Sequence, residues 1–418
     1  MTQRLTIGNF NVRNLVPKST GEGHHYFYSP GRHKCYWGEG NERENRYQQK
    51  IQWLACQLDR MDADIVCFQE IFAPEPLEDV IAQSRFAGQV KLYYAGQPDF
   101  KDRQFKGHPA RIYYTPLVAL MVADDFEVSE FSILDKFPQA LDFSAPVKEH
   151  SGRVWQLSLS QGGAMLDRFT RPVLRARIRL PKRFSQAQTQ TKKTPEMTLF
   201  SAHFKSKRPI EGRTRDPHPR QAAQAYLREY AIGRSRSLLL RGLEAAALRS
   251  YVLDALLEDE GIPVVVVGDL NDGPRSETTE IAGGLTQPLL NRDVANDFKK
   301  REAMMDAVAD LCLYSAYHQQ TQRTHRDVYY THIFDGFHDV LDHVLVSSHF
   351  IPLWAREGRG RDNLGKIGTL RVFNDHLVNA DVDDLSSDKV GRYLHTRSDH
   401  GQVTVRLDWF DREQPGSR

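Results

Sequence analysis

The chain has 418 residues, of which 40% are hydrophobic and 26% charged, the composition of a globular protein with a large core. Its formal net charge is only +2, so any attraction to a polyanion must come from local clusters of cations. The four cysteines are scattered without a Cys-x-x-Cys pair, which excludes a disulfide framework and is typical of a reducing compartment.

The N-terminal part of the chain predicts a strand, a helix and a second strand. Apolar and polar residues alternate between Leu5 and Val12, as in a strand with one buried face. Apolar residues recur at helical spacing between Arg46 and Met61, which predicts an amphipathic helix. Asp64–Glu70 is then an apolar strand that ends in a carboxylate. Residues 17–45, rich in glycine, proline, histidine and charge, predict a long loop.

The rest of the chain predicts one further helix, from Leu238 to Leu257, among many strands. The strands are expected at Val90–Tyr94, Leu117–Val122, Val128–Leu134, Arg171–Leu180, Met197–Phe204, Val340–Val346 and Gln402–Leu407. There is no internal repeat and no clear linker, so we expect a single domain over residues 1–418. Its long insertions are expected at about 17–45, 135–168, 205–235, 274–335 and 355–397.

Pro263–Pro274 contains the strongest local pattern. Four consecutive valines predict a strand that is covered on both faces. Gly268 ends this run, and Asp269 and Asn271 follow where the strand becomes a loop. A strand with an Asp/Asn turn would account for this segment by itself, so its functional meaning depends on the other strands.

Other predicted strands also begin or end in polar residues of the kinds used in catalysis. These residues are Asn9, Asn11, Glu70, His203, Asp342, Asp399 and His400. A single carboxylate at a strand end is usually a cap or turn residue, but this repetition predicts a site at the rim of a sheet. The local patterns by themselves favour a largely parallel α/β sheet.

The motifs Asn-Phe-Asn-Val, Asp-Ile-Val-Cys-Phe-Gln-Glu, Ser-Ala-His-Phe, Gly-Asp-Leu-Asn-Asp, Leu-Asp-His-Val-Leu-Val and Ser-Asp-His-Gly occur in this order. Together they resemble the endonuclease/exonuclease/phosphatase (deoxyribonuclease I-like) superfamily, over Leu5 to Leu407. The resemblance implies a four-layer α/β/β/α sandwich of two mostly antiparallel sheets with outer helices. It therefore replaces the parallel sheet that the local patterns favour.

The resemblance also implies catalytic roles. Asp269 would orient or deprotonate the attacking water, and Asn271 would donate to the phosphate. His400 would contact a phosphate oxygen or assist the nucleophile, and Asp342 would fix its tautomer. His203 stands where deoxyribonuclease-like and sphingomyelinase-like members have a catalytic histidine and AP endonucleases have a tyrosine. His343 follows Asp342 and should face away from the site.

The implied cofactor is Mg²⁺, or alternatively Mn²⁺. Glu70 would be the main ligand, with Asn11 beside it and Asp399 as a second carboxylate. Asn9, Lys205 and Lys207 would bind substrate. The two lysines stand in a His-Phe-Lys-Ser-Lys segment similar to that of bacterial extracellular nucleases. Residues 205–241, with ten Lys/Arg and three Asp/Glu, would suit a nucleic acid, although a solvated charged loop would look the same.

We therefore expect a metal-dependent nuclease that cleaves DNA or RNA. The alternative is a phosphatase or phospholipase C-type enzyme that acts on an inositol phosphate or sphingomyelin, and a third reading is a non-catalytic binding scaffold. The sequence offers no apolar docking loop, so no stable membrane association is expected. Without a signal region or a membrane-length apolar stretch, we expect a cytoplasmic protein unless a leader has been removed.

Overall fold

The structure is a computed structural model. It describes residues 2–18, 24–29, 32–35, 37, 40–105, 108–139, 141, 147–148, 154–155, 160–161, 164–184, 195–210, 219–284, 292–324, 328–334, 336–351, 363–377 and 396–410. None of the helices within these ranges is both long and apolar enough to cross a membrane.

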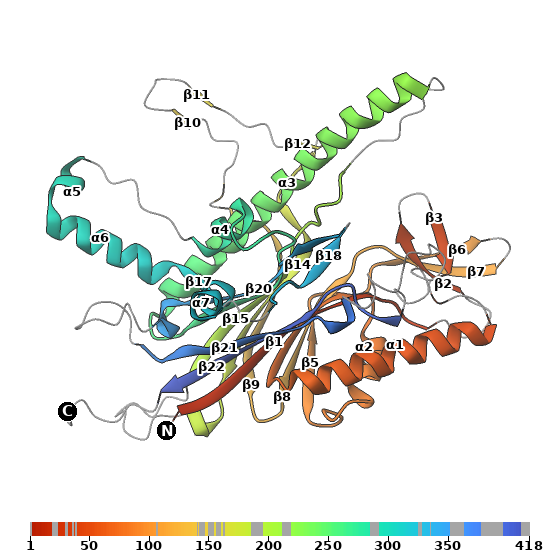
Figure 1. Ribbon diagram of the computed structural model, residues 1–418, viewed down its shortest axis with the longest axis horizontal. Helices are drawn as coiled ribbons and strands as arrows, with labels where there is room; N and C mark the ends of the chain where they lie inside the picture. Colours follow the sequence, from red (N-terminus) through yellow and green to blue (C-terminus); the bar gives the residue numbers. More distant parts are fainter. Residues whose placement is uncertain are drawn as a thin grey trace.

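Two six-stranded sheets form the body of the molecule (Figure 1). The first has the order β21 (Gly365–Phe373), β22 (Gln402–Phe410), β1 (Thr2–Leu15), β4 (Ile65–Ile71), β8 (Leu117–Ala123) and β5 (Val90–Tyr94). The second has the order β17 (Leu313–Ser315), β20 (Asp342–Ser347), β16 (Val264–Asp269), β15 (Glu196–His203), β14 (Arg168–Arg179) and β9 (Glu127–Lys136). Within these two sheets, only β1 with β4 and β15 with β16 pair in parallel, so both sheets are mostly antiparallel.

Three apolar cores separate four layers. Inner faces of both sheets bury Ile7, Ile65, Val265 and Val267 together in the central core. The outer face of the first sheet packs on α1 (Gly40–Met61) and α2 (Pro74–Ala82). Val264 and Val266 face α3 (Pro219–Glu258) on the outer side of the second sheet. The valine strand is therefore covered on both faces, and the α/β/β/α sandwich is confirmed.

Smaller helices and strands lie outside the two main sheets and their covering helices. The structure places α4 (Glu277–Gly283), α5 (Arg292–Asn296), α6 (Phe298–Leu311) and α7 (Ala316–Arg323) between β16 and β20. A hairpin of β18 (His332–Phe334) and β19 (Phe337–Asp339) leads into β20. A small sheet has the order β3 (Arg32–Cys35), β2 (His24–Ser29), β7 (His108–Tyr113) and β6 (Phe100–Phe105). Short pairs are formed by β10 (Val147–Lys148) with β11 (Val154–Trp155) and by β12 (Ser160–Gln161) with β13 (Ala164–Met165), and two 3-10 turns are Lys182–Phe184 and Ser348–Phe350.

Several predicted loops contain regular structure instead. Residues 17–45 include β2, β3 and the start of α1, and residues 355–397 include β21, an edge strand. Residues 274–335 hold α4 to α7. Part of 135–168, all of 185–194 and much of 355–397 lie outside the described residues.

Helix α3 begins at Pro219, well before the predicted start at Leu238, so the predicted insertion at 205–235 is partly helical. The described side chains from Arg220 to Ile232 are nearly all exposed. A helix that buries no face has no reason to repeat apolar residues at helical spacing, so this spacing did not reveal the first half of α3. Its alanine, arginine, glutamine and leucine residues do favour a helix.

Candidate active site

The site lies where the inner faces of the two sheets change from apolar to polar. Side chains two residues apart on a strand share a face, so the inner face of β1 continues from Ile7 to Asn9 and Asn11. In the same way β16 continues from Val267 to Asp269, and β20 begins at Asp342 before Val344. The polar strand ends found in the sequence therefore converge at one end of the central core.

Asp269 is the residue on which the site converges. Its Oδ2 accepts from Asn11 Nδ2 at 3.0 Å and lies 3.5 Å from His203 Nε2 and 3.9 Å from His400 Nε2. Its Oδ1 accepts from the backbone N–H of Asn271 at 2.8 Å. The carboxylate is thus surrounded by donors and fixed in direction.

Gly268 permits this arrangement. A Cβ at this position would lie 1.9 Å from the carbonyl oxygen of Ala202 on β15. Only glycine therefore lets β15 and β16 approach so closely that His203 and Asp269 end side by side in register.

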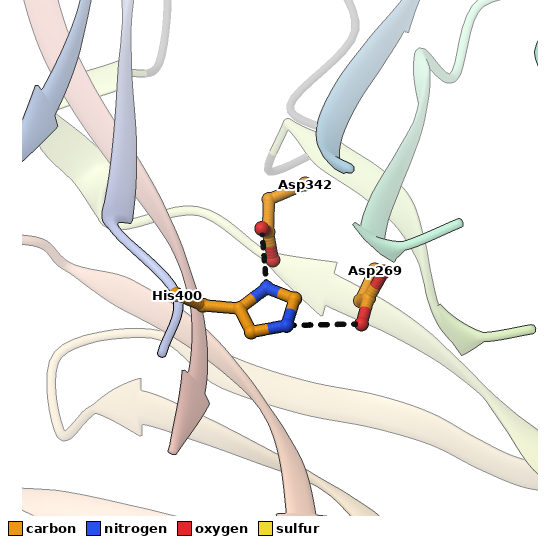
Figure 2. A group of neighbouring side chains, drawn as sticks. All are labelled: Asp269, Asp342 and His400. Carbon is orange, nitrogen blue, oxygen red and sulfur yellow. Dashed lines mark hydrogen bonds and ion pairs between the residues drawn. The ribbon is translucent and has the colours of Figure 1, made fainter. Parts of the chain in front are cut away.

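His400 lies between two carboxylates (Figure 2). Its Nδ1 is 2.8 Å from Asp342 Oδ2, so the predicted pairing with Asp342 is confirmed. Asn9 Nδ2 donates to the other oxygen, Oδ1, of Asp342 at 2.8 Å, and Asn9 Oδ1 accepts from Gln69. The chain Gln69–Asn9–Asp342–His400 fixes the imidazole ring from behind and leaves Nε2 directed toward Asp269.

Burial and charge shift the pKa values of this pair in ways that suit proton transfer. Burial raises the pKa of Asp269 to about 7, against the opposing effect of His400. Burial would lower the pKa of His400, but Asp342 and then Asp269 outweigh it and raise this pKa well above its usual value. A carboxylate able to take a proton near neutral pH thus stands beside an imidazole that is held protonated.

His203 completes the buried acid–base group. It is fully enclosed, and burial, reinforced by the cation of Arg171, holds its pKa well below the usual value. Its Nδ1 has no hydrogen-bond partner among the described residues. We therefore infer a neutral ring beside Asp269.

Glu70 and Asn11 lie next to each other at one side of the site. Glu70 is the penultimate residue of β4 and has a left-handed φ of 66°, and its Oε2 accepts from the backbone N–H of Asn14. Asn11 Nδ2 lies 3.4 Å from Glu70 Oε1. Among the described residues, Glu70 is not in an ion pair, so its charge remains available. The Glu70 carboxylate fits a hard cation such as Mg²⁺ or Mn²⁺. The oxygen of Asn11, Oδ1, accepts from the backbone N–H of Arg13, so the role of Asn11 as a metal ligand stays a prediction.

A second grouping could also hold a cation. Donor atoms of Asp269, Asp342 and His400 all lie within 4.8 Å of one another. We favour the Glu70 side for Mg²⁺, because His400 already bonds to Asp342 and Mg²⁺ prefers oxygen ligands.

The predicted ligand Asp399 is engaged elsewhere. It forms an ion pair with Arg13, with 3.3 Å between Arg13 Nε and Asp399 Oδ2. Together with the charge of His400, this cation holds the pKa of Asp399 below its usual value although burial opposes it. Its role as a metal ligand stays a prediction.

The predicted substrate contacts are placed unequally. Asn9 is fully buried and donates to Asp342, so it positions that carboxylate, and its predicted contact with substrate stays a prediction. Lys207 Nζ lies 3.1 Å from Asp339 and 3.9 Å from Asp272, so its charge is largely balanced. Lys205 Nζ donates only to neutral oxygens, of Ser206 and Arg208.

The environment of Lys205 is cationic. Burial, and then Arg171 and Arg241, lower the pKa of Lys205 to about 8. The carboxylate of Glu244, which accepts from the backbone N–H of Lys205, opposes this shift only in part, so the surroundings keep an excess of cations that favours an anionic ligand. Arg234 and Arg236 of the basic stretch donate instead to backbone oxygens of Lys207 and Ile210, so part of that stretch serves to hold the segment.

Asn271 and His343 both bond to backbone oxygens next to the catalytic motifs. Asn271 was predicted to donate to the phosphate, but its Nδ2 donates to the backbone oxygen of Phe204 at 3.0 Å and so joins the two strand ends. Its contact with phosphate stays a prediction. His343 Nε2 bonds to the backbone of Asp272, away from Asp269, as predicted.

The sequence patterns missed Lys50. This residue is fully buried on α1, and its Nζ donates to the backbone oxygens of Arg13 and Arg397. It thereby joins the end of β1 to the turn that carries His400. Burial lowers its pKa to about 7. The sequence did offer one indication of this role, because Lys50 stands beside Ile51 on the apolar side of a predicted helix.

Ser398 and Thr331 were also missed as supports. Ser398 Oγ donates to the backbone of Asn11 and accepts from the N–H of His400. Thr331 Oγ1 accepts from the N–H of Asp342 at 3.2 Å. Each hydroxyl fixes the backbone of a catalytic residue, and no sequence spacing could reveal that.

Comparison with protein families matches the model described as "Endonuclease/Exonuclease/phosphatase family" over residues 46–400. The chain belongs to the endonuclease/exonuclease/phosphatase family. This confirms the resemblance found from the strand-end motifs and identifies the protein as a phosphoester hydrolase of that family, whose enzymes generally use a divalent metal.

Solved structures of the family are similar to this chain at low identity. A family protein from Bacteroides thetaiotaomicron has 14% identity and a TM-score of 0.46, with 100% of this chain and 99% of that chain covered. A truncated TDP2 from Caenorhabditis elegans has 11% identity and a TM-score of 0.45, with 97% of each covered. A mannosyl-6-phosphatase of Bacteroides thetaiotaomicron has 13% identity and a TM-score of 0.45, with 96% and 99% covered. A search of the curated proteins finds no match.

Proposed function

We propose that this protein is a metal-dependent phosphodiesterase that cleaves DNA or RNA. The observation that carries the proposal is the position of Asp269, whose Oδ2 has His203 Nε2 at 3.5 Å and His400 Nε2 at 3.9 Å. These distances exceed that of a good hydrogen bond, so a water and a phosphate oxygen can compete for the three groups.

The chain's own residues supply the proton transfers. Water attacks phosphorus while its proton passes to Asp269, whose raised pKa suits a base near neutral pH. The bond from phosphorus to the leaving oxygen breaks as the new bond forms, and the leaving oxygen takes a proton from solvent. The protonated His400, fixed through Nδ1 by Asp342, donates from Nε2 to a phosphoryl oxygen. Asn11 holds the carboxylate of Asp269 in line with the attacking water.

A divalent metal would be held by Glu70 and Asn11. When bound, such an ion neutralises phosphoryl oxygens and lowers the pKa of a bound water. The site's fit to it rests on the hard oxygens of the Glu70 carboxylate, which forms no ion pair among the described residues.

A diester of a polyanion is favoured over a small monoester by the cations around the site. The Lys205 ammonium forms no ion pair among the described residues, although Glu244 accepts from the backbone N–H of Lys205, and Arg171 stands nearby with its Nη1 on the backbone of Phe204. Two cations that share one buried carboxylate next to a phosphate site suit a substrate with further phosphates along its length.

The test is a panel of substrates with Mg²⁺ or Mn²⁺ and with EDTA. The panel holds plasmid DNA, single-stranded DNA, RNA, bis(4-nitrophenyl) phosphate, inositol phosphates, sphingomyelin and sugar phosphates. We expect cleavage of a nucleic acid and of the synthetic diester, abolished by EDTA and by Asp269→Ala or His400→Ala with the fold intact by circular dichroism.

Cleavage of monoesters or of sphingomyelin, with nucleic acids untouched, would replace the nuclease with the phosphatase or phospholipase alternative. Equal activity of wild type and both variants would reject the mechanism. A matched control is Asp254→Asn, an exposed carboxylate on α3 away from the site, which should leave every activity unchanged.

A further inference from the structure

The β18–β19 hairpin carries the two most exposed large apolar side chains among the described residues. Phe334 is 71% exposed and Phe337 is 72% exposed. The two residues pair across the hairpin, so their side chains share one face of the ribbon. β18 projects beyond the upper ends of the central strands (Figure 1). Exposed rings at such a position are a feature of binding surfaces.

The base of this hairpin is attached to the catalytic residues. His332 forms a backbone bridge with His400, and the N–H of Gly401 donates to Thr331 at 2.7 Å. Thr331 also accepts from the N–H of Asp342. The hairpin is therefore held in a fixed position relative to the catalytic imidazole.

A series of rings leads from the catalytic histidine to the tip. The rings of His400 and His332 have centroids 4.9 Å apart, and His332 is stacked on Phe334 with an interplanar angle of 17° and centroids 6.4 Å apart. His332 and Phe334 are two residues apart on β18, so they face the same way. The face that bears Phe334 and Phe337 thus continues directly into the catalytic site.

The surroundings of the hairpin favour a charged, planar ligand over a lipid surface. Asp339, opposite His332, pairs with Lys207, so ionic groups flank the rings at their base. This ion pair joins the base of the hairpin to the chain segment that also carries Lys205. Two rings beside ionic groups bury too little apolar area for membrane docking, whereas they match a base attached to a phosphate.

We propose that Phe334 and Phe337 form a stacking subsite for a nucleobase next to the phosphate that is cleaved. This inference rests on the proposed nuclease function, and it names the part of the substrate that the hairpin would recognise. Stacking depends on the flat face of a base and not on its edge, so the subsite would accept any base.

The experiment compares two oligonucleotides of the same length, as DNA or RNA, whichever the wild type cleaves better. One carries natural bases and the other has abasic residues on both sides of the cleaved phosphate. We expect Phe334→Ala with Phe337→Ala to raise KM for the first about tenfold or more, with kcat within about twofold. Neither value should change for the abasic strand.

Matched variants separate stacking from folding. Phe298→Ala removes another exposed phenylalanine, on α6, and should change nothing. Phe334→Trp keeps a flat ring and should restore the KM. Equal losses on both oligonucleotides, or no loss on either, would refute the subsite.

A binding readout does not depend on cleavage. An oligonucleotide that contains 2-aminopurine, mixed with wild type in EDTA, should lose fluorescence on stacking, and the double variant should not quench it. If wild type cleaves neither oligonucleotide, the proposed function fails. The quenching measurement by itself then still shows whether Phe334 and Phe337 stack on a base. A third measurement is sedimentation with phosphatidylcholine–sphingomyelin vesicles. If wild type sediments with them, the double variant does not, and the KM of the double variant is unchanged, the rings bind a membrane instead.

Discussion

Replacing Asp342 with asparagine tests the geometry behind the catalytic proposal. Asp342 accepts two hydrogen bonds, from His400 Nδ1 at 2.8 Å and from Asn9 Nδ2 at 2.8 Å. An amide can accept only one of them, and its NH₂ group must then face a donor. The substitution also removes the main charge that raises the pKa of His400.

We expect kcat/KM for bis(4-nitrophenyl) phosphate to fall about 100- to 10,000-fold in Asp342→Asn, the range of a lost acid–base function. This corresponds to about 3 to 5 kcal/mol of activation free energy. Most of the loss should appear in kcat, because Asp342 is buried and does not contact the substrate. Both proteins are assayed at saturating Mg²⁺, so a difference in metal affinity does not contribute to the difference in kcat/KM.

The pH profile provides the second readout. In the wild type, activity should decline on the alkaline side where His400 loses its proton, and this limb should move to lower pH in the variant. Asp254→Asn is the matched control. A variant with activity within about threefold of wild type and an unmoved alkaline limb would refute the role of Asp342.

Three further predictions follow from the same geometry. Because burial raises the pKa of Asp269 to about 7 and the base must be deprotonated, kcat/KM should rise through about pH 7, and a rise complete by pH 5 would contradict this. Glu70→Gln should increase the half-saturating Mg²⁺ concentration about tenfold or more in activity titrations, and an unchanged value would exclude Glu70 as a ligand. Gly268→Ala places a Cβ 1.9 Å from the oxygen of Ala202 and should cost about 3 kcal/mol in urea unfolding, whereas Gly242→Ala on α3, with nothing within 4 Å, should be neutral or stabilising by up to about 1 kcal/mol.

Local patterns were informative about strands and poor about the connections between them. The buried valines of β16 and the apolar run of β4 were found because a covered strand must be apolar on both faces. The first half of α3 and the helix α6 were missed, since helices with little buried surface carry no apolar period. Edge strand β21 was missed because a register shift between Ile367 and Thr369 interrupts its alternation.

The sequence by itself determined which catalytic groups exist, in what order, and on which face of each strand they stand. Strict alternation along a strand carries Ile7 to Asn9 and Asn11, and Val267 to Asp269, on one face. Only the tertiary structure decided which groups meet. Asn9 reaches Asp342 across 333 positions of sequence, and this contact gives Asn9 a positioning role that the sequence did not predict. Such contacts depend on sheet order and on the packing of one sheet against the other, which no local periodicity encodes.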